Sequence, residues 1–313
     1  MKLSIVSTMY RSAPFLKAFY DRMTAAAAEY AESFELILVN DGSPDDSLIA
    51  ALALQKADPR VQVIDLSRNF GHHAAIVAGL THARGEEVFL IDCDLEEQPE
   101  WLSLFGAERR TRNVDVVFGV QQTRVGKRAS NFAGSLFWRA LNFMSTVRIP
   151  NDPMTCRLMS REYVNALLEV GDRVLYLAGV FAWTGFAQSA LPLVKTPRPS
   201  AHRSTYSLSR KLLQVADSFS SFSVAPLTLV FLLGLAIWTG SIVYGMVLLI
   251  QRLMFPQAIL SGFTSLMLSI WFLSGIIILT LGIIGMYVAK IFQEVKRRPL
   301  YIERRVYRGD GHE

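Results

Sequence analysis

Cysteine is scarce in this chain of 313 residues, which contains only Cys93 and Cys156. Two cysteines cannot form the disulfide framework of a small secreted domain, so we expect free thiols in a reducing compartment. A signal peptide is not expected either, because the apolar stretch before Tyr10 is short and contains Lys2. The N-terminal part of the chain is therefore predicted to lie in the cytoplasm.

Several motifs of nucleotide-binding and nucleic-acid-binding proteins are also absent. The chain has no Gly-x-Gly-x-x-Gly sequence and no phosphate-binding loop, which argues against a dinucleotide-binding enzyme. It has no zinc-finger spacing, no RNA-binding signature and no basic patch interleaved with aromatic residues. A nucleic-acid partner is not expected, and the net charge of +5 suits an anionic lipid surface better.

Charged residues are missing from two long stretches, 218–251 and 253–289. Each stretch exceeds the ~20 apolar residues that a helix needs to cross ~30 Å of hydrocarbon. A very apolar soluble core is the alternative, but core helices rarely run this long without a charge. Basic residues precede the first stretch and follow the second, while the connector holds only Arg252. The positive-inside bias therefore predicts two spans with both termini in the cytoplasm.

The first 125 residues alternate between strand and helix patterns. These patterns predict strands at 3–7, 34–39, 61–66, 87–91 and 114–120, and helices at 15–30, 46–55 and 73–82. The alternation predicts an α/β fold with a mostly parallel sheet, helices on both faces, and ligands at the carboxyl ends of the strands. Residues 126–217 are less regular, and the segment 208–222 is either an interfacial amphipathic helix or an ordinary linker helix.

Three acidic residues follow the strand predicted at 87–91. Asp92 and Asp94 lie at its end, and Glu96 comes two residues later. Hard divalent cations such as Mg²⁺ or Mn²⁺ bind carboxylate oxygens together with substrate phosphates. Such a cation can neutralise the charge that develops on a diphosphate leaving group. A solvated strand end is the alternative, because acids with this spacing are common by chance.

Polar residues also end the two strands before it. Asp41 can accept a hydrogen bond from a base or a ribose, or it can form an Asx turn that caps the next helix. Arg68 offers a guanidinium suited to phosphate, or an ion pair with one of the acids. The histidines lack partners at metal-ligand spacing and are interpreted as surface or packing residues: His72, His73 and His82.

The ordered set of motifs resembles family-2 glycosyltransferases of GT-A fold. More narrowly, it is similar to the polyprenyl-phosphate branch, which includes dolichol-phosphate mannose synthase and the bacterial undecaprenyl-phosphate sugar transferases. The likeness covers nearly the whole chain, and the segments that carry it are 4–10, 39–43, 68–71, 92–96, 218–227, 282–288 and 294–301. The acidic motif alone is weakly specific, whereas the ordered set with two terminal apolar stretches is strongly specific.

The resemblance implies a role for particular residues. Asp41 would contact the nucleotide base, Asp92 would contact the donor, and Asp94 with Glu96 would bind Mg²⁺ or Mn²⁺. Arg68 joins the expected donor-binding residues because its guanidinium suits a phosphate. Arg203 lies in a stretch similar to the family's lipid-phosphate motif, and Arg124 and Arg128 would assist it. The implied catalytic residues are Asp92, Asp94 and Arg203.

Four departures from the family pattern are present. Arg11-Ser12 stands where the family usually has Asn-Glu, Asn40 replaces the first of two aspartates, and Thr205 replaces a lysine. The stretch around Thr155 lacks the usual acid near the reaction centre, and the sequence leaves open whether Asp152 or Thr155 replaces it. A phosphate acceptor tolerates this loss, because its second pKa of ~6 makes it largely a dianion at neutral pH without a general base.

We therefore expect inverting transfer of a sugar from a nucleotide diphosphate to a polyprenyl phosphate, giving a lipid-linked monosaccharide for cell-envelope glycans. The alternatives are a processive polysaccharide synthase and an inactive, membrane-tethered nucleotide-sugar binding protein. The predicted parts are a cytoplasmic catalytic domain at 1–207, an interfacial helix at 208–222, two transmembrane helices with a short external loop within 223–290, and a basic cytoplasmic tail at 291–313. The resemblance also implies a bacterial inner membrane and a homo-oligomer.

Overall fold

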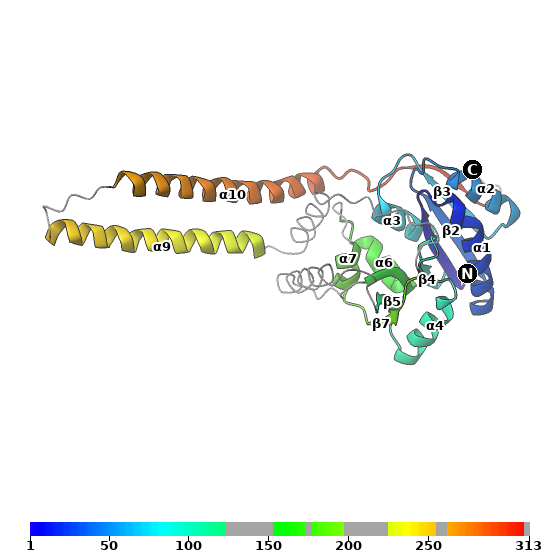
Figure 1. Ribbon diagram of the computed structural model, residues 1–313. Helices are drawn as coiled ribbons and strands as arrows, with labels where there is room; N and C mark the ends of the chain where they lie inside the picture. Colours follow the sequence, from blue (N-terminus) through cyan, green and yellow to red (C-terminus); the bar gives the residue numbers. More distant parts are fainter. Residues whose placement is uncertain (123–152, 173–176, 197–224, 255–261, 310–313) are drawn as a thin grey trace. The chain divides into compact units, whose positions relative to one another are not determined.

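The computed structural model describes residues 1–122, 153–172, 177–196, 225–254 and 262–309. These residues belong to two compact units. The first unit contains the described residues up to 196 together with the C-terminal segment that begins at Arg297. The second unit contains two long helices, which are drawn in yellow and orange in Figure 1.

The first unit is built on an eight-stranded sheet with the order β7-β5-β6-β4-β1-β2-β3-β8. The strands are β1 (Leu3–Met9), β2 (Phe34–Asn40), β3 (Val61–Leu66), β4 (Glu87–Leu90), β5 (Val116–Gln121), β6 (Pro153–Ser160), β7 (Gln188–Leu193) and β8 (Glu303–Tyr307). The strands β4, β1, β2 and β3 are mutually parallel. β6 is antiparallel to β4 and β5, β7 is parallel to β5, and β8 is antiparallel to β3.

The sheet is mixed, which corrects the prediction of a mostly parallel sheet. The difference comes from β6, which enters between β4 and β5, and from β8, which the sequence analysis assigned to a basic tail. Parallel strands are recognised by the helix that connects them, and neither of these strands belongs to such a strand–helix–strand repeat. Their places in the sheet are therefore set by contacts that are distant in the sequence.

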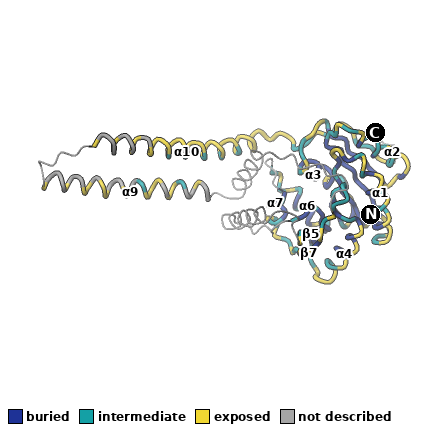
Figure 2. The backbone as a smooth tube through the Cα atoms, in the orientation of Figure 1, coloured by how far each residue is buried: buried dark blue, intermediate teal, exposed yellow. Residues whose placement is uncertain are grey.

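Helices cover both faces of the sheet, as predicted. They are α1 (Ala13–Tyr30), α2 (Ser47–Ala57), α3 (His72–His82), α4 (Trp101–Arg112), α6 (Arg161–Glu169) and α7 (Leu177–Trp183). Residues of α1, α2 and α4 join one apolar cluster with Ile5, Leu36 and Phe89. On the opposite face, a Cβ on Gly79 of α3 would come within 2.3 Å of the Val6 side chain, so close packing there requires glycine. Figure 2 shows the buried strands between these helices.

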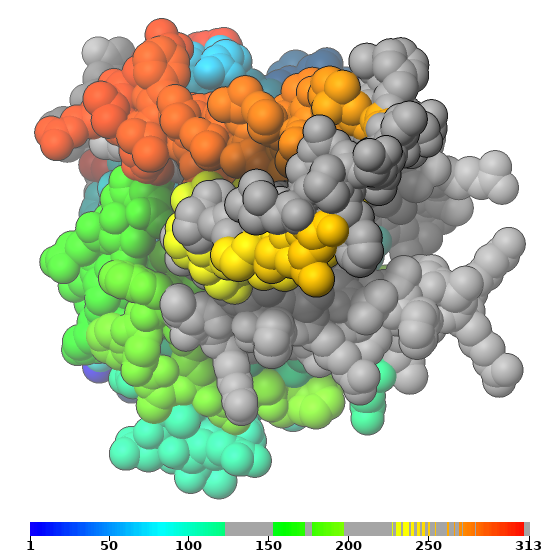
Figure 3. Space-filling model, turned by 90° about the vertical axis from the view of Figure 1, so that its left-hand side faces the viewer, coloured from blue at the N-terminus to red at the C-terminus, as the bar shows by residue number. Residues whose placement is uncertain are grey.

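The second unit consists of α9 (Ala225–Met254) and α10 (Phe263–Val295). Within the described residues, the segment Phe272–Val295 is long and apolar enough to cross a membrane, by length and composition. Large apolar side chains of α10 are exposed, including Phe272, Ile278 and Ile291. Figure 3 looks along both helices from the C-terminal end of α9 and the N-terminal end of α10.

Candidate active site

The carboxyl ends of β1, β2, β3 and β4 lie at one edge of the sheet. These strands are parallel and in register, with Met9 opposite Asn40 and Asn40 opposite Asp65. Ligands of such sheets bind at this edge. The loops that leave it contain most of the site residues that the sequence indicated.

A buried carboxylate that the sequence analysis missed, Glu97, organises the loop after β4. Its side chain is fully buried and accepts hydrogen bonds from the Asp92 N–H at 3.4 Å and the Thr155 N–H at 3.2 Å. The Lys195 Nζ lies 3.3 Å from its Oε1. Glu97 therefore joins the loop after β4, the strand β6 and the residues after β7. No sequence spacing signals such a group, because its three partners are distant in the chain.

Asp92 lies beside His72, the first residue of α3. The His72 Nε2 is 3.6 Å from the Asp92 Oδ1, and its Nδ1 is 3.1 Å from the Thr8 Oγ1. Burial lowers the pKa of His72, which favours a neutral imidazole. The interpretation of His72 as a surface or packing residue was therefore incomplete, because this imidazole contacts two residues of the site.

The turn after Asp92 holds the two remaining acids of the motif. The Asp94 Oδ1 accepts a hydrogen bond from the Glu96 N–H at 3.1 Å. Between them, Leu95 has a φ of 63°, a conformation that is uncommon for a residue with a side chain. Strained residues of this kind cluster at functional sites. The Lys195 Nζ lies 3.8 Å from the Glu96 Oε2.

The electrostatics of this cluster favour an added cation. Burial, reinforced by Asp94, raises the pKa of Asp92, and burial, reinforced by Asp92, raises the pKa of Glu97. Burial alone would lower the pKa of Lys195, but Glu97 and Asp92 outweigh it and raise that pKa. One ammonium thus faces several carboxylates that repel one another.

These residues fit a divalent cation that shares its ligands with a substrate. Among the described residues, no three His, Cys, Asp or Glu side chains converge as a ligand set made by the protein alone. Mg²⁺ usually takes one or two carboxylates and completes its octahedron with phosphate oxygens and water. The hard oxygen donors of Asp94 and Glu96, next to carboxylates with raised pKa values, suit that arrangement.

A second loop, which follows β2, places Asp41 against the loop after β3. The buried Asp41 carboxylate accepts hydrogen bonds from the Phe70 N–H at 2.7 Å and the Gly71 N–H at 3.1 Å. Burial raises the pKa of Asp41, and these two N–H groups oppose that shift. Gly42 has a φ of 58°, and a Cβ there would come within 2.5 Å of the Arg68 backbone. The two loops are therefore in backbone contact.

Arg68 lies in the same region on the loop after β3. Its guanidinium stacks on the Phe70 ring at 3.9 Å and donates to the Asn69 carbonyl at 2.8 Å. It is close enough to Asp41 to lower that residue's pKa. The structure thus brings Asp41, Arg68, Asp92, Asp94 and Glu96 to one edge of the sheet.

Several predicted site residues lie outside the described residues, namely Arg124, Arg128, Asp152 and Arg203. Thr155 is described. Its side chain lowers the pKa of Asp92, while its N–H donates to the Glu97 Oε1 at 3.2 Å. Both cysteines are free and buried.

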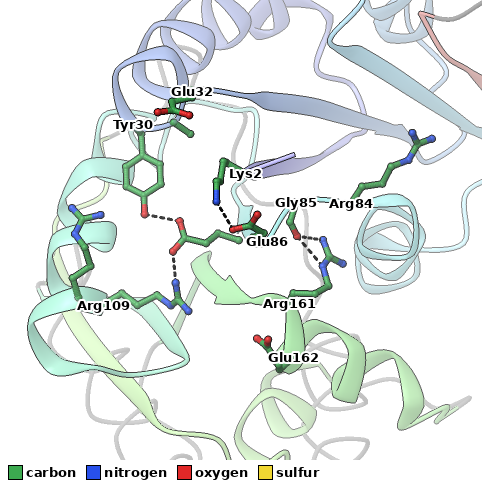
Figure 4. A pocket seen from close by; sticks show the side chains of 12 residues that line it. Lys2, Tyr30, Glu32, Arg84, Gly85, Glu86, Arg109, Arg161 and Glu162 are labelled. Carbon is green, nitrogen blue, oxygen red and sulfur yellow. Dashed lines mark hydrogen bonds and ion pairs between the residues drawn. The ribbon is translucent and has the colours of Figure 1, made fainter.

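A cavity of about 740 Å³ lies at the opposite edge, by the first residues of β1 and β4. Figure 4 shows its charged side chains, among them Lys2 paired with Glu86. Arg109 forms an ion pair with Glu87. Arg161 donates to the Gly85 carbonyl at 2.8 Å. These contacts hold the N-terminal strand ends together, and we assign the cavity no part in the chemistry at the other edge.

Comparison with known proteins gives consistent matches. Residues 4–168 match the family described as glycosyl transferase family 2. A protein of Mycobacterium tuberculosis described as a glycosyltransferase is 42% identical over 310 residues, which cover 99% of this chain and 90% of that protein. A bactoprenol glucosyl transferase derived from prophage SfII of Shigella flexneri is 32% identical over 99% of this chain and 100% of its own length. A solved mannosyltransferase from Pyrobaculum calidifontis, in complex with GDP-Man and Mn²⁺, has a TM-score of 0.49 at 18% identity, with 70% of this chain and 63% of that chain covered.

Proposed function

Since the chain belongs to glycosyl transferase family 2 and is a glycosyltransferase, we propose that it transfers a sugar from a nucleotide diphosphate to a polyprenyl phosphate, with inversion at the anomeric carbon. The observation that carries the proposal is the cluster of Asp92, Asp94 and Glu96 beside Lys195 at the carboxyl edge of the sheet. The lipid acceptor is supported by a relative named bactoprenol glucosyl transferase, which matches along its full length. The apolar helix α10 suits an acceptor embedded in a membrane.

Asp94 and Glu96 are proposed to hold Mg²⁺ or Mn²⁺. The cation would supply positive charge to the diphosphate as it leaves. The Lys195 ammonium would act on the same anion from the β7 side, because it lies within 3.8 Å of the Glu96 carboxylate. Asp92 would orient the donor sugar, and its contact with His72 limits its rotation.

Asp41 and Arg68 are proposed to hold the nucleotide. The Asp41 carboxylate already accepts hydrogen bonds from two backbone N–H groups, which fix its position against the loop after β3. A carboxylate oxygen can accept further hydrogen bonds, so a base N–H can be added. Arg68, stacked on Phe70, offers its remaining N–H groups to the donor phosphates.

The acceptor requires positioning more than activation. A phosphate monoester has a second pKa of ~6 and is largely a dianion at neutral pH, so its oxygen can attack without a general base. The task is then to offset the repulsion between two anions and to align them. We assign the lipid phosphate to Arg203, assisted by Arg124 and Arg128, on the strength of the sequence resemblance.

The membrane arrangement is proposed on the same basis. The chain would consist of a cytoplasmic catalytic domain at 1–207, an interfacial helix at 208–222, two transmembrane helices within 223–290 and a basic cytoplasmic tail. The multi-pass protein would lie in a bacterial inner membrane with both termini in the cytoplasm. This arrangement places the catalytic domain on the side of the membrane where nucleotide sugars are made.

The test is transfer of radiolabelled sugar to undecaprenyl phosphate in membranes that contain the full chain, with a panel of UDP- and GDP-hexoses. We expect Asp94→Ala and Arg203→Ala each to lower turnover by about 100-fold or more, since removing one group that stabilises transition-state charge typically costs that much. Asp21→Ala and Arg112→Ala are matched controls, because both side chains are exposed and lie on the helices α1 and α4, outside the loops at the carboxyl edge of the sheet.

The product distinguishes the alternatives. A lipid-linked monosaccharide supports the proposal, polymer would identify a processive synthase, and no transfer with any donor would support a binding protein. Near-normal turnover by both Asp94→Ala and Arg203→Ala would end the assignment of these residues.

A further inference from the structure

The C-terminal strand β8 is part of the catalytic sheet. It pairs antiparallel with β3 along the edge of the sheet, with Val63 opposite Tyr307 and Ile64 opposite Val306. Only residues 296–302 separate β8 from the end of α10. We infer that β8 is a positioning element of the donor site, which holds the loops that carry Arg68 and Asp41. This inference rests on the donor roles proposed for those two residues.

Two hydrogen bonds tie the segment that enters β8 to the first residue of the loop after β3. The Ser67 N–H donates to the Ile302 carbonyl at 2.8 Å, and the Arg304 Nη2 donates to the Ser67 carbonyl at 2.7 Å. Both backbone polar groups of Ser67 are therefore satisfied by the C-terminal segment. Arg68 is the next residue in the chain. Phe70 and Gly71 follow shortly after it, and their N–H groups donate to the Asp41 carboxylate.

A second path leads from Arg304 to the other donor loop. The Arg304 Nη1 lies 3.5 Å from the Asp65 Oδ2, and the Asp65 side chain is only 3% exposed. Asp65 accepts a hydrogen bond from the Asn40 Nδ2 at 2.8 Å, and the Asn40 Oδ1 accepts one from the Ser43 N–H at 3.2 Å. Through Asp65, Arg304 thus stabilises Asn40 and Ser43, which lie before and after Asp41 in the loop that follows β2.

This path gives a physical reason for asparagine at position 40, where the family pattern has aspartate. An aspartate there would set a second carboxylate against the buried Asp65, and the pair would repel each other. The Asn40 amide instead donates to Asp65 and accepts from Ser43. Asn40, Asp65 and Arg304 therefore form one complementary set.

Protection of a sheet edge explains only part of these contacts. An unpaired edge strand invites aggregation, and any strand that covers β3 would prevent it. Edge pairing needs backbone hydrogen bonds alone. The Arg304 side chain in addition contacts the Ser67 carbonyl and the Asp65 carboxylate, which are connected to the loops that carry Arg68 and Asp41. Glu303, which is 2.7 Å from the His82 Nε2, fixes β8 to the end of α3 as well.

The test compares Arg304→Ala with Arg308→Ala in the full-length chain, purified in detergent. Arg308 directly follows β8 and its Nη2 lies 3.2 Å from the His82 Nδ1, so Arg308→Ala removes the same side chain from the same segment without removing a contact to Ser67 or Asp65. We expect Arg304→Ala to speed amide hydrogen exchange at residues 67–71 by about fivefold. With Mn²⁺ present, we expect it to weaken the binding of UDP or GDP, whichever the wild type binds, by a similar factor. In the transfer assay, the donor KM should rise while the KM for undecaprenyl phosphate stays unchanged.

Two further results bear on the inference. Arg304→Lys keeps the charge beside Asp65, so it should restore part of the exchange protection. Unchanged exchange at residues 67–71 in Arg304→Ala, or an equal change in Arg308→Ala, would overturn the inference. If the wild type transfers no sugar to lipid, the proposed function fails, but hydrogen exchange still decides whether β8 positions these loops.

Discussion

At the scale of single residues, Arg11 adopts a conformation that its side chain disfavours. It follows β1 with a φ of 56°, and its N–H donates to the Ser43 Oγ at 2.7 Å. The left-handed conformation costs a residue with a Cβ about 1 kcal/mol, and asparagine tolerates it better than most. The chain uses asparagine in this conformation at Asn113, where φ is 50° and α4 ends.

We therefore expect Arg11→Asn to stabilise the protein by about 0.5 kcal/mol and to raise its Tm by about 1–2 °C. The hydrogen bond to Ser43 is made by the backbone and is retained. Thermal unfolding of the detergent-solubilised chain measures the change, and Arg11→Val, with a β-branched side chain, should lower the Tm instead. A lower Tm for Arg11→Asn would mean that the arginine side chain contributes more than its conformation costs.

At the scale of elements, the turn between α2 and β3 is held by Asp58. Its buried carboxylate contacts the Arg60 Nη2 and the Tyr20 hydroxyl, each at 2.8 Å, and so links the turn to α1. The hydrogen bond from Arg60 is the main reason why the pKa of Asp58 falls to about 2. A carboxyl whose pKa is lower in the folded state stabilises that state above its unfolded pKa, and the contribution is lost as the pH falls towards the folded pKa.

Asp58→Asn should accordingly destabilise the chain by about 1–2 kcal/mol at pH 7, a value discounted because Arg60 is half exposed. As the pH falls from the unfolded pKa of ~3.9 towards the folded value, the difference in the free energy of unfolding between the two proteins shrinks. About half of it should remain at pH 3. Denaturant unfolding of both proteins at pH 7, 5 and 3 measures this. A destabilisation that does not change with pH would show that the side chain acts by packing or neutral hydrogen bonds.

The sequence predicted those elements whose pattern is local. The strands that became β1 to β5 and the helices α1, α2 and α3 were expected close to their observed bounds, because strand and helix alternate there with distinct periods. β8 was missed because a short strand rich in arginine resembles a membrane-proximal basic tail, and its partner β3 is more than 200 residues away. Glu97 and Lys195 were missed for the same reason, since their meeting depends on β4, β6 and β7 lying near one another. By contrast, Asp41, Arg68 and Asp92 follow predicted parallel strands, so their convergence could be anticipated.

At the scale of the whole molecule, the sheet constrains how the chain meets a membrane. β1 to β7 lie before α9 in the sequence and β8 lies after α10, yet all eight strands belong to one sheet. A sheet cannot be assembled from strands on opposite sides of a bilayer. The chain between β7 and β8 must therefore cross the membrane an even number of times. If α10 crosses it, a second segment must cross it as well. The segment of α9 that suits this role is 225–251, which contains no charged residue.

Cysteine labelling tests this parity. The native cysteines Cys93 and Cys156 are buried, so they add little background in the folded protein. Basic residues flank the helix pair, and the only charged residue between the two charge-free stretches is Arg252, near the end of α9. We therefore expect Ser261→Cys, between α9 and α10, to react with a membrane-impermeant maleimide in intact bacterial cells. Arg298→Cys, an exposed position just after α10, should react only once the membrane is permeabilised. Labelling of Arg298→Cys but not Ser261→Cys in intact cells would invert the orientation while keeping the parity. Protection of both until permeabilisation would mean that neither helix crosses, because a single crossing would break the sheet that holds the donor loops.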